Sequence, residues 1–162
     1  MRTGAAAPPR FLADSMLGKL ARWLILLGYD ARYAGSDGRS DKNLQEEAAR
    51  EGRVFLTRDT GIPEVDGLRM IVIRPQRFED QLRLVFDALK LKARRDKLFS
   101  RCTYCNKELE SVPRQQALPL MPPLVRGLDT PFHRCPSCAR MYWNGTHTER
   151  TVLKIKRLGI KL

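Results

Sequence analysis

Four cysteines in two Cys-x-x-Cys pairs constrain the fold of this chain more than any other feature. The pairs read "CTYC" and "CPSC" and consist of Cys102, Cys105, Cys135 and Cys138. A gap of two residues lets one tight turn present two sulfurs to one ion, and Zn²⁺ takes four such ligands in a tetrahedral shell. The two pairs therefore predict one closed Cys₄ zinc site, which is structural because no ligand position stays open.

Two other uses of this spacing stay open: a pair of disulfides, or a dithiol redox pair. Disulfides belong to exported proteins, and the first ten residues, "MRTGAAAPPR", lack the hydrophobic centre of a secretory signal. We therefore expect a cytoplasmic protein that binds zinc, with residues 1–10 as a disordered lead. No apolar run approaches the roughly 18 residues of a membrane-spanning helix, so no membrane partner is expected.

The first 97 residues alternate between segments that suit strands and segments that suit helices. Short apolar runs typical of strands lie at residues 10–14, 29–35, 53–59 and 68–74. Amphipathic runs typical of helices lie at residues 15–28, 40–52 and 77–91. Such alternation predicts an α/β domain with a mainly parallel sheet flanked by helices.

A change in composition divides the chain. A basic, polar stretch at residues 90–97 looks like a hinge, and the cysteine pairs and a proline-containing segment follow it. We predict an α/β domain at residues 11–97, a small zinc ribbon at 98–148, and a basic C-terminal helix or arm at 149–162.

The charge balance indicates a polyanionic partner. The formal net charge is +12 and the sequence pI is about 10.1. Phosphate backbones are the commonest polyanions in a cell, and the chain has no strongly basic amphipathic anchor for anionic lipid. Nucleic acid is therefore the preferred partner, and a basic but unspecialised surface is the alternative. A small-molecule ligand is not expected.

Three aspartates are candidate ligands for a divalent cation. Asp14 and Asp59 end strand-like runs, and Asp41 opens a helix-like run. In parallel sheets, ligands bind beyond the carboxyl ends of the strands. Each aspartate alone is read more simply as a helix cap. A cluster of all three would repel itself unless a cation such as Mg²⁺, which prefers oxygen ligands, were bound there.

Several other side chains are candidates for contacts with nucleic acid. Lys19, Arg22 and Arg58 could guide a phosphate backbone toward the acids, although a solvated helix face explains Lys19 equally well. His147 could contact phosphate or cap a following helix. The aromatic pair Tyr142–Trp143 could stack on a base or form the small core of the ribbon.

With these features in view, the sequence resembles the Mut-seven C-terminal RNase domain family, a PIN-like nuclease fold with a fused zinc ribbon. The matching segments include "FLADSMLGKLARWL", "SDKNLQEEAAREGRVFLTRD", "RCTYCNKEL" and "FHRCPSCARMYW". The resemblance implies a ribonuclease that depends on Mg²⁺ or Mn²⁺, with Asp14, Asp41 and Asp59 as the family's acids. Asp80 or Asp37 could serve as a fourth acid.

The sequence departs from the family pattern at two informative positions. Ile25 stands where the family often has a basic residue, and Ala139 replaces the glycine that commonly follows the second cysteine pair. We expect hydrolysis of RNA that leaves a 5′-phosphate and a 3′-hydroxyl, with the ribbon and the basic tail binding the phosphate backbone. A non-catalytic module that docks on structured or ribosomal RNA is the alternative.

Overall fold

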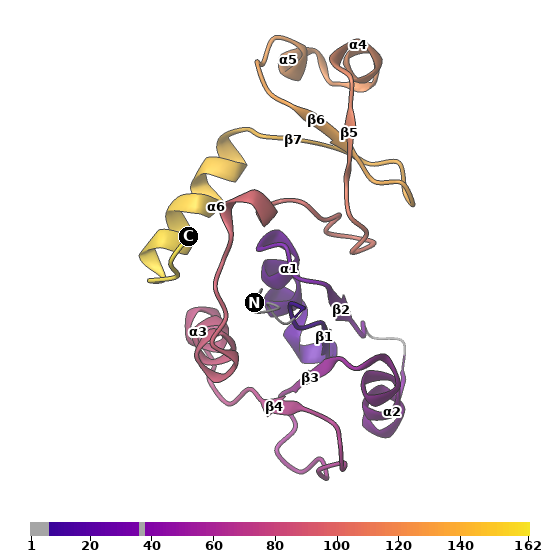
Figure 1. The fold of residues 1–162 in the computed structure, drawn as a ribbon, viewed down its shortest axis with the longest axis vertical. Helices are drawn as coiled ribbons and strands as arrows, with labels where there is room; N and C mark the ends of the chain where they lie inside the picture. Colours follow the sequence, from indigo (N-terminus) through magenta and orange to yellow (C-terminus); the bar gives the residue numbers. More distant parts are fainter. Residues whose placement is uncertain (1–6, 36–37) are drawn as a thin grey trace, which may run out of the picture.

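A computed structural model describes residues 7–35 and 38–162 of the protein. Figure 1 shows a parallel-sheet domain and, beyond it, a smaller part built around three antiparallel strands, with the last helix returning from the smaller part toward the first. The α/β class expected from the alternating segments is confirmed. Asp37, one of the two candidates for a fourth acid, lies outside the described residues.

The larger sheet has four parallel strands in the order β2-β1-β3-β4. The strands are β1 (Phe11–Ala13), β2 (Ala31–Tyr33), β3 (Val54–Thr57) and β4 (Met70–Val72). Phe11 of the central strand β1 pairs with Ala31 on one side and Val54 on the other. Strands β1 and β3 are completely buried, as expected for a parallel sheet covered on both faces.

Alternating side chains of the central strand β1 pack into two separate hydrophobic cores. Phe11 and Ala13 belong to the larger core, with apolar residues of α1 (Gly18–Leu26) and α3 (Phe78–Leu89). Leu12 points to the other face and packs with Leu44 and Ala48 of α2 (Asp41–Glu51). The period of two along the strand therefore places α1 and α3 on one face of the sheet and α2 on the other.

The helix ends follow the chemistry of their flanking residues. The Asp14 carboxylate caps the 3₁₀ turn η1 (Ser15–Leu17), which is the simpler of the two roles considered for this aspartate. Ser40 caps α2, and Gly52 ends it with a left-handed backbone. Gly28, at φ +91°, lets the chain leave α1 beside the linker, because a Cβ atom there would lie 2.4 Å from the Lys97 carbonyl oxygen.

The C-terminal segment forms a helix, α6 (Thr146–Arg157), which begins a few residues earlier than predicted. Ile155 of α6 is fully buried, and Leu158 and Ile160 just after the helix are nearly so. All three belong to the larger core, together with residues of α1 and α3. The basic tail is therefore an integral part of the α/β domain.

The smaller part is an antiparallel sheet of β5 (Glu110–Val112), β6 (Phe132–Arg134) and β7 (Met141–Trp143). The 3₁₀ turn η2 (Arg95–Lys97) precedes it. Between β5 and β6 lie three single-turn elements, α4 (Arg114–Ala117), η3 (Leu118–Leu120) and α5 (Pro123–Arg126). Its core contains only four buried residues, Ala117, Met121, Val125 and Phe132.

Candidate functional site

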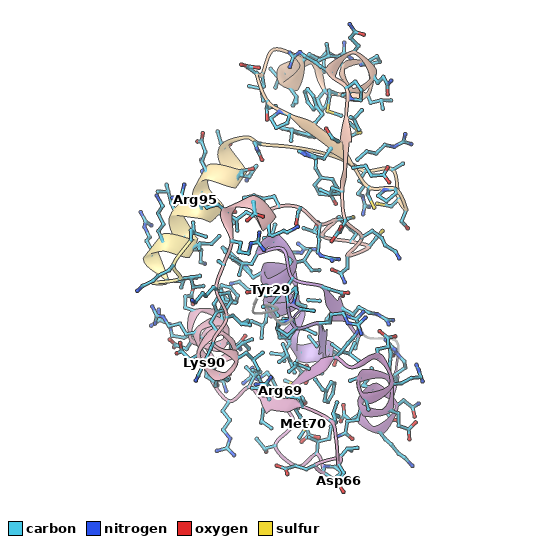
Figure 2. The ribbon with its side chains drawn as sticks, viewed as in Figure 1. Tyr29, Asp66, Arg69, Met70, Lys90 and Arg95 are labelled. Carbon is cyan, nitrogen blue, oxygen red and sulfur yellow. The ribbon has the colours of Figure 1, made fainter. Side chains whose placement is uncertain are left out.

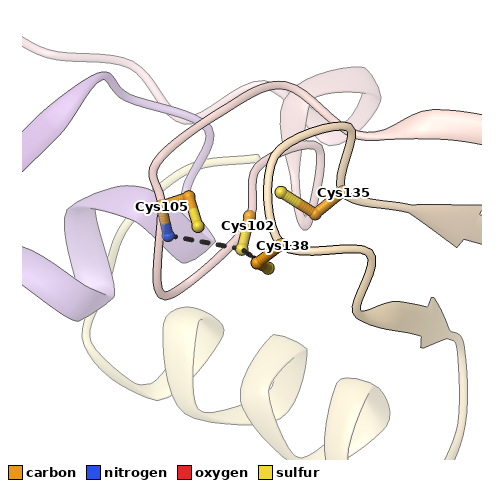
Figure 3. A group of neighbouring side chains, drawn as sticks. All are labelled: Cys102, Cys105, Cys135 and Cys138. Atoms are coloured by element: carbon orange, nitrogen blue, oxygen red, sulfur yellow. Dashed lines mark hydrogen bonds between the residues drawn. The ribbon is translucent and has the colours of Figure 1, made fainter.

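The four cysteines converge at the base of the smaller sheet. Their sulfur atoms all lie within 4.8 Å of one another, and the close-up in Figure 3 shows both pairs pointing into one space. Cys102 and Cys135 are buried, and all four cysteines are free thiols, so the disulfide alternative does not describe this fold. Four sulfurs so close together can hold a metal ion such as zinc.

Both cysteine pairs sit in turns of the same construction. In the first, the Cys102 amide donates to the Lys107 carbonyl at 2.9 Å, and the Asn106 amide donates to the Cys102 carbonyl at 2.8 Å. The second turn repeats both hydrogen bonds at 2.9 Å. Two equivalent turns from opposite sides present their sulfurs in the same way, which fits a tetrahedral ligand set.

Each turn contains a residue with a left-handed backbone directly after its second cysteine. Asn106 has φ +57° and Ala139 has φ +59°. Asparagine tolerates this region, whereas alanine is strained there because its Cβ atom approaches the backbone. This geometry explains why glycine is common at the position of Ala139 in the family and identifies a strained residue in this chain.

The electrostatics of Cys102 favour the metal-binding form of sulfur. Burial raises the pKa of the thiol, but hydrogen bonds from the Tyr142 hydroxyl and the Cys105 and Tyr104 amides outweigh it and lower the pKa to about 6. The Tyr142 oxygen lies 3.1 Å from the sulfur, and burial together with this contact raises the pKa of Tyr142 to about 12. Because the thiolate is the ligand for zinc, these contacts prepare Cys102 for coordination.

The carboxyl end of β1 places Asp14 against the end of β3. Asp14 is only 5% exposed. One carboxylate oxygen accepts from the Met16 amide at 2.8 Å and acts as the cap of η1. The other accepts from the Arg58 amide at 2.7 Å. The carboxylate therefore bridges the ends of two neighbouring strands, in addition to its role as a helix cap.

Asp59 follows β3 at the same edge of the sheet and is exposed. Its amide donates to the Thr57 hydroxyl at 3.0 Å, and its carboxylate accepts from the Gly61 amide at 2.8 Å. Its second oxygen accepts no hydrogen bond from residues 7–35 and 38–162. Asp41 begins α2, the helix that leaves the carboxyl end of β2, so the topology brings it to this edge as well.

The three aspartates share an edge of the sheet but do not form a closed ligand cluster. Among residues 7–35 and 38–162, the four cysteines are the only group of three or more potential ligands whose donor atoms all lie within 4.8 Å. Asp80, the other candidate for a fourth acid, lies in the first turn of α3 and pairs with Arg83 at 3.4 Å. Asp14 and Asp59 follow the adjacent parallel strands β1 and β3.

The predicted phosphate contacts occupy different surroundings. Lys19 lies 4.8 Å from the centre of the Phe78 ring, at the start of α3, and Arg22 is exposed one turn further along α1. Arg58 is half-buried and directly precedes Asp59 in the chain. Ile25, which stands where the family often has a basic residue, is only 5% exposed and packs in the larger core.

The aromatic residues and His147 surround a cavity of about 340 Å³ between the ribbon and α6. Tyr142 and Trp143 line it, together with His147 from the first turn of α6. His147 does not cap the helix, because Gly145 occupies the cap position. Sequence reasoning missed three arginines near α3 and α6, which are Arg77, Arg150 and Arg157. The sequence marks the C-terminal segment as basic, but it could not show that Arg150 and Arg157 of α6 line a groove with residues of α3.

The described helices are all too short or too polar to cross a membrane. No solved structure matches the chain. A human protein, "Exonuclease mut-7 homolog", is 33% identical over 104 residues, which cover 60% of this chain and only 12% of the human protein. The family model of the Mut7-C RNase domain matches residues 9–155, which include both the parallel sheet and the cysteine pairs. The chain therefore belongs to the Mut7-C RNase domain family and is a nuclease domain.

Proposed function

We propose that this domain is a divalent-metal-dependent ribonuclease whose active site is the carboxyl edge of the parallel sheet. The observation that carries the proposal is the 2.7 Å hydrogen bond from the Arg58 amide to Asp14. It joins the ends of β1 and β3 and so keeps Asp14 close to the segment that presents Asp59. In open parallel sheets this edge is where ligands bind.

The donor chemistry at this edge suits Mg²⁺ or Mn²⁺. Such ions need only one or two protein carboxylates, because waters and substrate phosphates complete the shell. Asp59 has an oxygen that accepts no hydrogen bond within the described part of the chain, and each Asp14 oxygen accepts one hydrogen bond and keeps a free lone pair. Asp14 and Asp59 would hold the ion, with Asp41 as the third acid. A bound ion supplies Lewis acidity and neutralises charge on the phosphodiester.

The remaining candidates act on the substrate. Lys19 and Arg22 on α1 and Arg58 beside the acids attract the RNA backbone, and the ribbon, which carries a net charge of +7 with the tail, extends the contact. His147 lies at the ribbon cavity and would contact RNA there. Zinc held by the four cysteines is structural, since it keeps the ribbon folded and leaves no ligand position for substrate. Free thiols suit a reducing compartment such as the cytoplasm.

The test is cleavage of a 5′-labelled single-stranded RNA by the zinc-loaded full chain, with MgCl₂ or MnCl₂ either added or omitted. Omission is preferable to a chelator, because a chelator would also remove zinc. We expect cutting only with added ion and products that carry 5′-phosphates. Cutting without a divalent ion, or products ending in 2′,3′-cyclic phosphates, would refute the proposal.

One observation favours a second function, an RNA-binding module without turnover. Both oxygens of Asp14 already accept backbone hydrogen bonds, as they would in a purely structural helix cap. Such a module would bind structured RNA through its positive charge. Tight, salt-sensitive binding with no cleavage in any ion would support it over the ribonuclease.

A further inference from the structure

A groove of about 560 Å³ lies between α3 and α6. Its charged lining is strongly biased toward cations. The basic residues are Arg77, Arg83, Arg150, Lys154 and Arg157, and the acidic ones are Glu79 and Asp80. Five positive and two negative side chains leave the groove with three uncompensated positive charges.

The uncompensated charges can be assigned to individual residues. Lys154 pairs with Glu79 at 3.1 Å, and Arg83 pairs with Asp80 at 3.4 Å. The side chains of Arg77, Arg150 and Arg157 are exposed and form no ion pair or hydrogen bond with any other part of the chain that the structure describes. Three unpaired guanidinium groups around one groove are suited to binding phosphate oxygens.

Contacts between the two helices fix the direction of the groove. Lys154 meets Glu79, and four residues later in both helices Arg83 donates to the Leu158 carbonyl at 3.2 Å. The order of the two contacts is the same along both helices, and α6 begins eight residues before Lys154 whereas α3 begins one residue before Glu79. Figure 1 shows α6 running from the ribbon toward α3. Arg150, one turn before Lys154, lies on the side of the groove where both helices begin.

The same end of the groove opens at the edge of the sheet that carries the acids. Arg77 occupies the position directly before α3, the helix that follows the carboxyl end of β4. Strand β4 pairs with β3, and the segment after β3 contains Asp59. The ammonium group of Lys19 on α1 lies 4.8 Å from the centre of the Phe78 ring, in the first turn of α3. A chain lying in the groove would therefore leave it toward Asp14 and Asp59.

We propose that this α3–α6 groove binds the phosphates of single-stranded RNA and directs the strand to the acids. The inference rests on the proposed ribonuclease function, because that function makes RNA the anion at this edge. The volume of about 560 Å³ lies in the range of small-ligand sites and suits one or two nucleotides of a single strand. The C-terminal helix is then part of the substrate site.

A second basic cavity, of about 870 Å³, provides an internal comparison. It lies at the opposite, amino-terminal edge of the sheet, near Tyr29, and its lining includes Arg69 and Lys90, which Figure 2 labels. Two of its arginines are already paired, Arg94 with Asp96 and Arg101 with Glu108. RNA bound there would lie at the edge without the acids.

The test compares RNA affinity after removal of three positive charges from either cavity. The groove variant is Arg77→Gln/Arg150→Gln/Arg157→Gln, and the control is Arg69→Gln/Lys90→Gln/Lys92→Gln. Both are made in the full chain with Asp59→Asn, so that the probe, a fluorescein-labelled single-stranded RNA, stays intact. Fluorescence anisotropy gives Kd over a series of salt concentrations, and thermal melts check that both variants fold. If the triple groove variant does not fold, the single variant Arg150→Gln replaces it.

We expect the groove variant to weaken binding at least about 10-fold and to reduce the slope of log Kd against log salt by about 2, since each single-strand phosphate contact contributes about 0.7. Arg150→Gln alone should reduce the slope by about 0.7. The control should change Kd by less than about 3-fold. Equal losses in both triple variants, or no loss in the groove variant, would overturn the groove assignment. Groove-dependent binding by a parent protein that cuts no RNA would instead refute the nuclease proposal and leave the groove assignment intact.

Discussion

The side-chain amide of Asn106, in the first cysteine turn, donates a 2.7 Å hydrogen bond to the carboxylate of Asp30, directly before β2. The side-chain oxygen Oδ1 of Asn106 accepts from the Ala31 amide at 3.3 Å. The guanidinium group of Arg53, directly before β3, forms an ion pair with the same carboxylate at 2.6 Å. The residue whose left-handed backbone shapes the metal-binding turn therefore also joins the ribbon to the parallel sheet.

Removal of the Asn106 side chain should weaken this connection. Glycine at this position keeps the left-handed backbone, so Asn106→Gly should lower the free energy of unfolding by about 1 kcal/mol through the lost hydrogen bonds. Asn106→Ala should cost about 1 kcal/mol more, because alanine is strained at positive φ. Urea denaturation of the zinc-loaded variants measures both. Equal stability of Asn106→Gly and the parent would show that the contact does not stabilise the fold.

The Asp30 carboxylate should make stability depend on acid pH. Burial raises its pKa, but hydrogen bonds from Arg53 and Asn106 and the nearby charges of Arg53 and Arg101 outweigh burial and hold the pKa below its ordinary 3.8. The stabilisation is therefore present above the ordinary pKa and is lost as pH falls through the lower, folded-state value.

The stability difference between the parent and Asp30→Asn should accordingly be constant above about pH 5 and shrink below pH 3.8. Chemical denaturation at a series of pH values measures it. Asp66→Asn, which removes one exposed carboxylate from a loop (Figure 2), is the matched control. A difference that grows on acidification would show that the pKa of Asp30 is raised instead.

The order of elements in the α/β domain could be predicted because its signals are local. Phe11 and Leu12 differ in the face they occupy simply because side chains alternate along a strand. Gly52 ends α2 as its position after the last helical residue indicates. The cysteine turns were equally predictable, because the spacing within each pair is set by the geometry of a single ion.

Contacts between distant segments could not be predicted. The sequence left the tail as a helix or an arm because five basic residues are interspersed with its apolar ones, and only the fold shows Ile155 and Leu158 buried with α1 and α3. The link from Asn106 to Asp30 joins residues 76 positions apart. The carboxyl edge was expected to gather three acids, but the sequence could not show that both Asp14 oxygens accept backbone hydrogen bonds.

The strained backbone at Ala139 predicts a stabilising substitution. Ala139→Gly should raise the free energy of unfolding by about 0.5 to 1 kcal/mol, because relief of the positive-φ strain exceeds the entropy that glycine adds to the unfolded chain. Ala49→Gly on the exposed side of α2 should have the opposite sign. Denaturant midpoints compare the two. A loss of stability in Ala139→Gly would contradict the strain assignment.

Loss of one cysteine should unfold the ribbon and spare the parallel sheet. We expect about one zinc per chain in the parent and much less in Cys138→Ser, because the ribbon core is too small to fold without the ion. Ser137→Ala, in the same turn, should retain zinc. Elemental analysis measures the metal, and hydrogen exchange should show lost protection in β5–β7 only. A zinc-free parent with full protection there would contradict the metal assignment.

The most direct test of the proposed active site is the single-turnover rate of RNA cleavage in MgCl₂ by Asp59→Asn and Asp66→Asn, measured beside the parent. Both substitutions remove one exposed carboxylate, but only Asp59 lies at the carboxyl edge of β3. Loss of a metal ligand should slow cleavage at least about 100-fold, beyond the usual effect of an outer-shell partner. We predict that loss for Asp59→Asn and a rate within about 2-fold of the parent for Asp66→Asn. Equal rates in all three proteins would contradict the account.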